Sequence, residues 1–140
     1  MKKTLVFLLL NTALLAFDSM TASKIFDKIF SALIPKENIC VYTLSPMYTE
    51  VIENASSLSL CTKLKKADII LVDSFDEVPK GSEKMVLFAT SYRVYKKEKS
   101  AVGAFYWDRG HVKIKFSQQR LNDKNITLPK AFNKYIMDEL

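Results

Sequence analysis

The stretch AVGAFYWDRGHVKIKFSQQRLNDKNITL, residues 101–128, decides the fold. It contains two apolar runs, 102–107 and 112–116, on either side of Asp108-Arg109-Gly110. Two β-prone segments around a short polar turn that ends in glycine are typical of a β-hairpin. The sequence therefore predicts a hairpin here.

The two runs of this hairpin differ in pattern. Run 112–116 alternates apolar and polar residues, which predicts one buried and one solvated face. Run 102–107 is apolar throughout, which predicts a strand inside the sheet rather than at its edge. We therefore expect Phe105, Ile114 and Phe116 to be core residues.

The rest of the chain alternates short strands with short helices. Apolar runs with little alternation predict strands at 38–44, 57–62, 68–72 and 85–90. Helical segments are expected from Ser23 to about Leu33, over 46–55 after Ser45, at 63–67, 91–97 and 117–122, and from Lys130. This order predicts an α/β fold: a single-domain three-layer sandwich whose sheet is mainly parallel, with an antiparallel C-terminal hairpin.

Residues 1–22 have the form of a secretory signal peptide. Lys2 and Lys3 precede an apolar run over 5–17, and small residues follow. Cleavage is expected after Ala22, with Ala16 as the second choice. The competing interpretation is an uncleaved anchor, but a spanning helix needs about 20 predominantly apolar residues. We therefore expect an exported, periplasmic domain over residues 23–140.

Composition excludes some function classes. The chain has a formal net charge of +6, and its lysines are scattered, so together with export this argues against nucleic acid as a partner. The two cysteines, Cys40 and Cys61, cannot form a disulfide framework and suggest no metal site. An oxidising compartment permits one bridge between them, and the sequence leaves bridged and free thiols equally open.

No catalytic, cofactor or metal site is expected. Asp73, Asp76 and Glu77 follow the 68–72 run and could form an acidic cluster, but Asp73 is better interpreted as ending the strand and capping a turn. The lone His111 has no Ser or Cys partner at a recognisable spacing. The sequence therefore predicts a protein that is not an enzyme.

The best functional candidates lie at the hairpin turn. Tyr106, Trp107, Arg109 and His111 combine aromatic rings with an arginine, the side chains enriched in interface hot spots. They are our candidate partner-binding residues. The competing interpretation, which we favour for Trp107, places its ring in the core.

Residues 103–132 resemble the end of the YfiR-like periplasmic family. The shared pattern is a strand that begins at a glycine (Gly103), a turn that ends in a glycine (Gly110), and an alternating strand at 112–116, which has the form V-x-F-x-I in the family and reads V-K-I-K-F here. A helical turn, an Asn-x-x-Leu-Pro step at 125–129 and a last helix follow. The resemblance extends loosely over most of residues 23–140. This chain departs from the family in Trp107, a longer polar turn and fewer cysteines.

The resemblance implies a regulatory partner-binding protein. Such a protein binds the periplasmic part of an inner-membrane diguanylate cyclase, holds it inactive, and releases it on envelope or redox signals. A homodimer is compatible with this role. The alternative from another class is a small periplasmic solute-binding protein for a transporter or sensor, although such proteins usually enclose their ligand between two domains.

Overall fold

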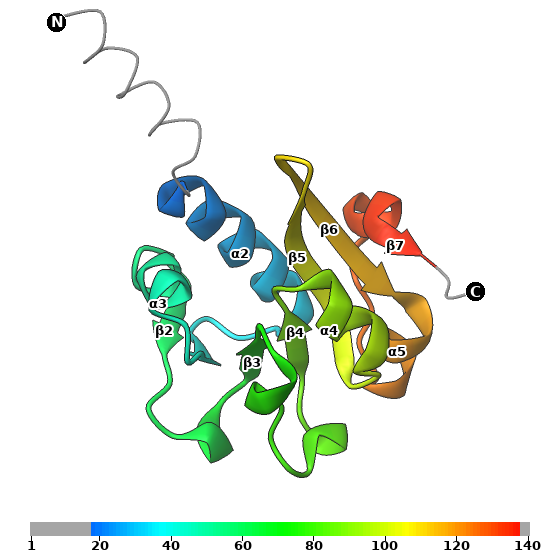
Figure 1. Cartoon of the computed structure of the whole chain (residues 1–140), viewed down its shortest axis with the longest axis horizontal. Helices are drawn as coiled ribbons and strands as arrows, with labels where there is room; N and C mark the ends of the chain where they lie inside the picture. The colour runs from blue at the N-terminus through cyan, green and yellow to red at the C-terminus, as the bar shows by residue number, and fades with distance from the viewer. Residues whose placement is uncertain (1–17, 138–140) are drawn as a thin grey trace, which may run out of the picture.

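A seven-stranded sheet in the order β2-β1-β3-β4-β5-β6-β7 runs through the protein. The structure, a computed structural model, describes residues 18–137 (Figure 1). Every neighbouring pair of strands is parallel except β5 and β6, which form the antiparallel hairpin. The strands are β1 (Ile39–Tyr42), β2 (Leu58–Leu60), β3 (Ile69–Val72), β4 (Leu87–Ala89), β5 (Ala101–Asp108), β6 (His111–Ser117) and β7 (Ile136–Met137). The expected mainly parallel α/β sandwich is confirmed.

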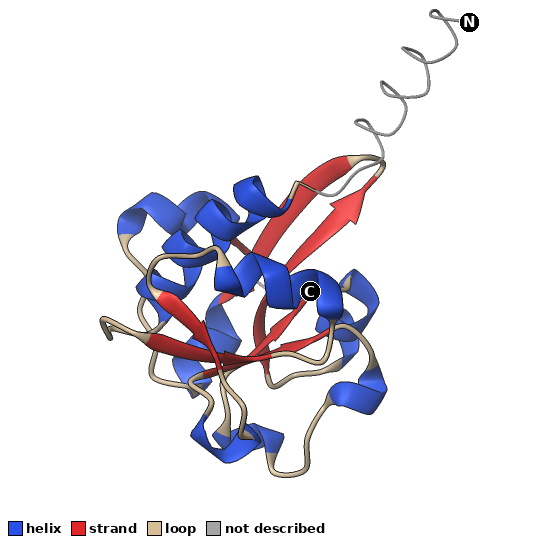
Figure 2. Ribbon diagram, turned by 90° about the vertical axis from the view of Figure 1, so that its left-hand side faces the viewer, coloured by secondary structure: helices blue, strands red, loops and turns tan. Residues whose placement is uncertain are grey.

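Helices cover both faces of this sheet (Figure 2). The first face, here called the α2 face, carries α2 (Ser19–Leu33), α3 (Pro46–Glu53) and the 3-10 helix η4 (Lys130–Tyr135). The second, the α4 face, carries α4 (Tyr92–Lys97). The remaining elements are α5 (Gln118–Asp123) and the single-turn 3-10 helices η1 (Leu64–Lys66), η2 (Phe75–Glu77) and η3 (Ser82–Lys84).

The core on the α2 face is built around phenylalanine rings. Phe26 of α2 lies 4.8 Å from Phe105 of β5, centroid to centroid, and Phe30 lies 5.2 Å from Phe88 of β4. Phe105 and Phe116 are fully buried, as expected, whereas Ile114 is only partly buried. β3 is buried at all four positions because both of its faces are covered.

Gly103 allows β5 and β6 to approach closely. The register between β4 and β5 shifts here: Leu87 pairs with Ala101, but Phe88 pairs with Gly103, so β5 contains one extra residue. A Cβ atom at Gly103 would lie 2.6 Å from Cδ1 of Phe116 and 2.7 Å from the carbonyl oxygen of Lys115. Only glycine leaves room for the Phe116 ring at this position.

Helix α2 begins four residues earlier than the sequence pattern predicts. Asp18 caps it by accepting a hydrogen bond from the backbone N–H of Thr21. The hydrogen bond from the Thr21 hydroxyl, together with this backbone one, lowers the pKa of the Asp18 carboxyl. Ala22 and Ser23 are buried, and the Ser23 hydroxyl contacts the carbonyl oxygens of Ser19 and Val51 at 2.6 Å each. Most of the signal-peptide prediction falls on residues 1–17, outside the described residues. Cleavage after Ala22 would remove this cap and the first helical turn, whereas cleavage after Ala16 would leave both intact.

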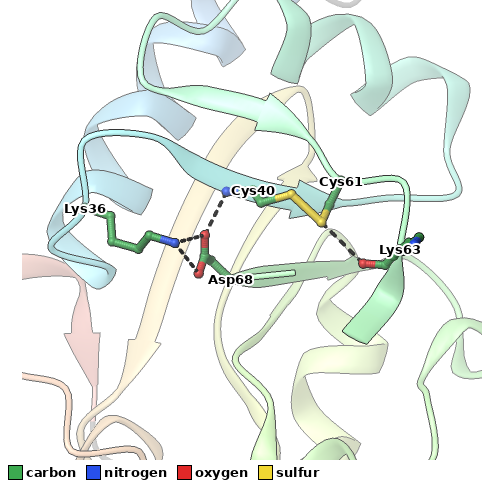
Figure 3. A network of polar contacts seen from close by, with 5 residues as sticks. All are labelled: Lys36, Cys40, Cys61, Lys63 and Asp68. Carbon is green, nitrogen blue, oxygen red and sulfur yellow. Dashed lines mark hydrogen bonds and ion pairs between the residues drawn. A yellow bond between two sulfur atoms is a disulfide. The ribbon is translucent and has the colours of Figure 1, made fainter. Parts of the chain in front are cut away.

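Cys40 and Cys61 form a disulfide between β1 and the segment that follows β2 (Figure 3). Asp68 supports the same region, because its carboxylate accepts from the Cys40 backbone N–H at 2.9 Å and pairs with Nζ of Lys36 at 3.0 Å. The Cys61 Sγ atom lies 3.3 Å from the carbonyl oxygen of Lys63, a contact without a proton because a disulfide sulfur carries none. The bridge ties the three-residue edge strand β2 to the sheet.

Reduction of this bridge should lower the free energy of unfolding by about 3 kcal/mol, the chain-entropy estimate for a loop of this length. The measurement is urea denaturation with and without reductant. The Cys40→Ser/Cys61→Ser double variant should match the reduced protein and should not respond to reductant. Two free thiols titrated in the denatured, unreduced protein would contradict the bridge.

Candidate functional site

The carboxyl ends of four neighbouring strands meet at one edge of the sheet. β1, β3, β4 and β5 are parallel and adjacent, so the chain leaves all four on the same side. From β1 the chain goes to β2 on one side and then to β3 on the other, which makes the β1/β3 boundary a topological switch point. Open α/β sheets bind their ligands outside the carboxyl ends of strands at such a point. We call this side of the molecule the carboxyl edge.

Exposed apolar side chains gather at the carboxyl edge. The part of the chain that the structure describes has seven large apolar side chains with high exposure, and six belong to this edge, each between 40% and 59% exposed. Helix α2 precedes β1 and runs antiparallel to it, so its first turn also lies here. We define the apolar rim as Met20, Leu44, Met47, Phe75, Tyr92 and Trp107. Exposed apolar side chains at one edge of the sheet are candidates for contact with a partner.

Cations lie over the aromatic rings of this edge. The Tyr92 and Tyr106 rings are 5.2 Å apart, and Nζ of Lys115 lies 5.0 Å from the Tyr92 centroid. The Arg93 guanidinium lies 5.8 Å from the centroid of the Phe75 ring. These contacts join η2, α4 and the hairpin into one aromatic and basic surface.

The structure separates the four candidate residues of the hairpin. Tyr106 is 9% exposed and packs on the α4 face, where its ring supports Tyr92. Trp107 points to the α2 face, with its ring 6.3 Å from that of Phe105, and is 48% exposed. The core interpretation of Trp107 is therefore wrong, because about half of its side chain is exposed, one residue pair from the closing pair of the hairpin turn. Arg109, at the turn, and His111, the first residue of β6, are exposed.

A polar trio fixes helix α3 and the carboxyl ends of β3 and β4 relative to one another. The Thr90 hydroxyl donates to Oδ1 of Asp73 at 2.8 Å, and the buried Tyr48 hydroxyl is hydrogen-bonded to Thr90. Burial and the nearby Asp73 carboxylate raise the pKa of Tyr48 to about 12, so its phenol stays protonated at neutral pH. The trio therefore positions the edge.

The sequence-based interpretation of Asp73 needs correction. Its carboxylate accepts from Thr90, the residue after the neighbouring strand β4, rather than capping its own turn. Glu77 takes the local role, since its Oε1 accepts from the Asp73 backbone N–H at 2.6 Å. Among residues 18–137, no group of three or more His, Cys, Asp or Glu side chains is arranged to hold a metal ion.

Sequence reasoning missed most of the rim. Four rim residues follow a strand by two to five positions: Leu44, Met47, Phe75 and Tyr92. From sequence alone, an apolar residue at such a position is as readily interpreted as a core residue as an exposed one. The one usable signal was position, since the carboxyl ends of parallel strands share an edge.

No helix in the described part of the chain is long and apolar enough to cross a bilayer.

The first five strands define the protein as an open α/β protein with strand order 2-1-3-4-5. No family model matches the chain, and no curated protein matches it. A solved structure is similar, the crystal structure of a conserved domain protein from Vibrio cholerae O1 biovar eltor str. N16961. The TM-score is 0.56 at 10% sequence identity, over 84% of this chain and 59% of that one. This similarity supports the fold alone, and the chain spans less than two thirds of that protein's length.

Proposed function

We propose that this protein is a non-enzymatic periplasmic regulator that binds a membrane-bound signalling protein and holds it inactive. The observation that carries the proposal is the apolar rim beside the exposed hairpin turn. Rim and turn together place Trp107, Tyr92, Phe75 and Arg109 on accessible surface.

The composition of this surface fits a protein partner. Aromatic residues, methionine and arginine are enriched in protein–protein interfaces, and all of these occur here. Charges of both signs surround the apolar side chains, with Arg93 and Lys115 near the hairpin and Asp73 and Asp76 after β3. Such a mixture provides specificity for one partner.

The class of partner comes from the sequence resemblance. A YfiR-like regulator would contact the periplasmic domain of an inner-membrane protein such as a diguanylate cyclase. Export by the N-terminal segment would bring the domain into that compartment. The regulator would then lower the output of the cyclase by binding outside the cytoplasmic catalytic domain.

The experiment is a charge reversal at the turn, Arg109→Glu. An exposed turn charge contributes little to stability, so the melting temperature should stay near wild type. Partner binding should weaken by at least about 1 kcal/mol, a several-fold rise in Kd. Periplasmic pull-down with mass spectrometry identifies the partner, and the cellular cyclic dinucleotide level should rise as in a deletion strain.

The control is Lys80→Glu, an equal reversal at an exposed lysine on the loop between β3 and β4. That loop ends at the start of β4, on the opposite edge of the sheet, so the control should bind and repress normally. If Arg109→Glu also binds and represses normally, the turn is not part of the contact surface.

A further inference from the structure

Strand β6 has one edge that is only partly paired. One edge of β6 pairs with β5 from His111 to Phe116, but the other edge pairs with β7 only at Phe116 and Ser117. Within residues 18–137, the main chain of 111–115 forms hydrogen bonds with no strand or loop other than β5. This leaves an open strand edge near the hairpin tip.

The turn geometry shows which main-chain groups point outward. Arg109 and Gly110 have φ angles of 53° and 81°, as in a two-residue type I′ turn, so Asp108 and His111 form its closing pair. Hydrogen-bonded and non-hydrogen-bonded pairs alternate along an antiparallel ladder. His111, Lys113 and Lys115 therefore bond to β5, whereas Val112 and Ile114 direct their N–H and C=O groups outward. The N–H and C=O groups of Phe116 point outward in the same way as those of Val112 and Ile114, and Phe116 does pair with β7.

The two faces of this edge differ in chemistry. On the α4 face, β6 presents His111, Lys113 and Lys115. On the α2 face, Val112 is the cross-strand partner of the half-exposed Trp107, and Ile114 is partly buried. Helix η4 and β7 lie beside the later part of β6, and the tip of the hairpin extends beyond them (Figure 1).

We propose that this edge binds an extended segment of the partner protein as an added strand, with acidic residues alternating with apolar ones. Main-chain bonds to Val112 and Ile114 would supply affinity, as in other cases of β-augmentation. Acidic side chains would face His111, Lys113 and Lys115, and apolar ones would cover Trp107 and Val112. The inference deepens the proposed function and rests on the hairpin being the contact surface.

Charge decides between this partner and a second copy of the chain. Two β6 edges pairing with each other would bring Lys113 and Lys115 of both copies onto neighbouring strands. Like charges opposite one another destabilise a strand pair. An acidic strand has the complementary charge on the same face.

The probe is a synthetic peptide of about eight alternating Glu and Val residues, a length that spans one strand edge. The full chain is titrated with it, and the emission of Trp107, the only tryptophan, is followed. Binding should cover the ring and shift its emission to the blue. A matched peptide of alternating Lys and Val should give no shift. Absence of a response to the Glu–Val peptide would overturn the inference.

Two variants test the main-chain and charge contributions separately. Val112→Pro removes the outward-pointing N–H group of residue 112 but breaks no hydrogen bond to β5. The fold should therefore persist, while peptide binding weakens about tenfold or more. Val112→Thr keeps that N–H and should bind within about twofold of wild type. Lys113→Glu should weaken binding of the Glu–Val peptide and allow binding of the Lys–Val peptide.

Equal binding by Val112→Pro and wild type would overturn the strand-addition mode, and an unchanged peptide preference in Lys113→Glu would overturn the acidic partner. A dimer in light scattering that Val112→Pro dissociates would assign the edge to a second copy instead. These outcomes are separable from the proposed function, because the pull-down with Arg109→Glu does not depend on the peptide.

Discussion

Replacing Arg120 by alanine should lower the free energy of unfolding by at least about 3 kcal/mol, because buried carbonyl groups would lose their donor. Arg120 of α5 is only 3% exposed, and its Nη1 donates to the carbonyl oxygens of Tyr95 at 2.6 Å and Ala101 at 3.0 Å. Its guanidinium also lies 4.6 Å from the centroid of the Tyr95 ring. One side chain thus joins the last turn of α4 to the start of β5.

The control for this prediction is Arg93→Ala. Arg93 also lies over an aromatic ring, that of Phe75, but it is exposed. Replacing Arg93 by alanine should lower the free energy of unfolding by no more than about 1 kcal/mol. Urea denaturation of both variants gives the comparison, and equal midpoints for Arg120→Ala and wild type would contradict the role of Arg120.

Phe105→Ala should destabilise the protein by about 3–5 kcal/mol, the usual cost of removing a buried aromatic side chain. The ring is fully buried and packs edge-on against Phe26 of α2, so alanine would leave a cavity between the sheet and this helix. Ile114→Ala, on the facing strand, should cost clearly less because Ile114 is only partly buried. Thermal melts of both variants test the difference, and equal shifts would contradict the burial pattern of the hairpin.

The strands could be predicted from sequence because each is a short apolar run bounded by polar or turn-forming residues. Strand β7 could not, since Ile136 and Met137 become a strand only through pairing with the distant Phe116 and Ser117. The first turn of α2 was missed because Ser-Met-Thr-Ala at 19–22 fits a signal-peptide cleavage region as well as a capped helix.

The candidate site was harder to predict than the fold. Exposure of Trp107 and Phe75 depends on how far the neighbouring helices reach, and no local pattern contains that information. The hairpin turn itself was predictable, because Arg109-Gly110 follows the preference of a two-residue turn for glycine. Its four candidates were chosen by residue type, so the buried Tyr106 was grouped with three exposed residues.

The extra residue at Gly103 has a consequence for the chemistry of the hairpin. Side chains of a strand alternate between the two faces of the sheet, so one additional residue moves every later side chain of the strand to the opposite face. A regular β5 of the same sequence would turn Phe105 and Trp107 toward α4 and Tyr106 toward α2. The irregularity between β4 and β5 thus determines which face of the sheet each side chain of the hairpin occupies. It places Trp107 on the α2 face and Lys113 and Lys115 on the α4 face.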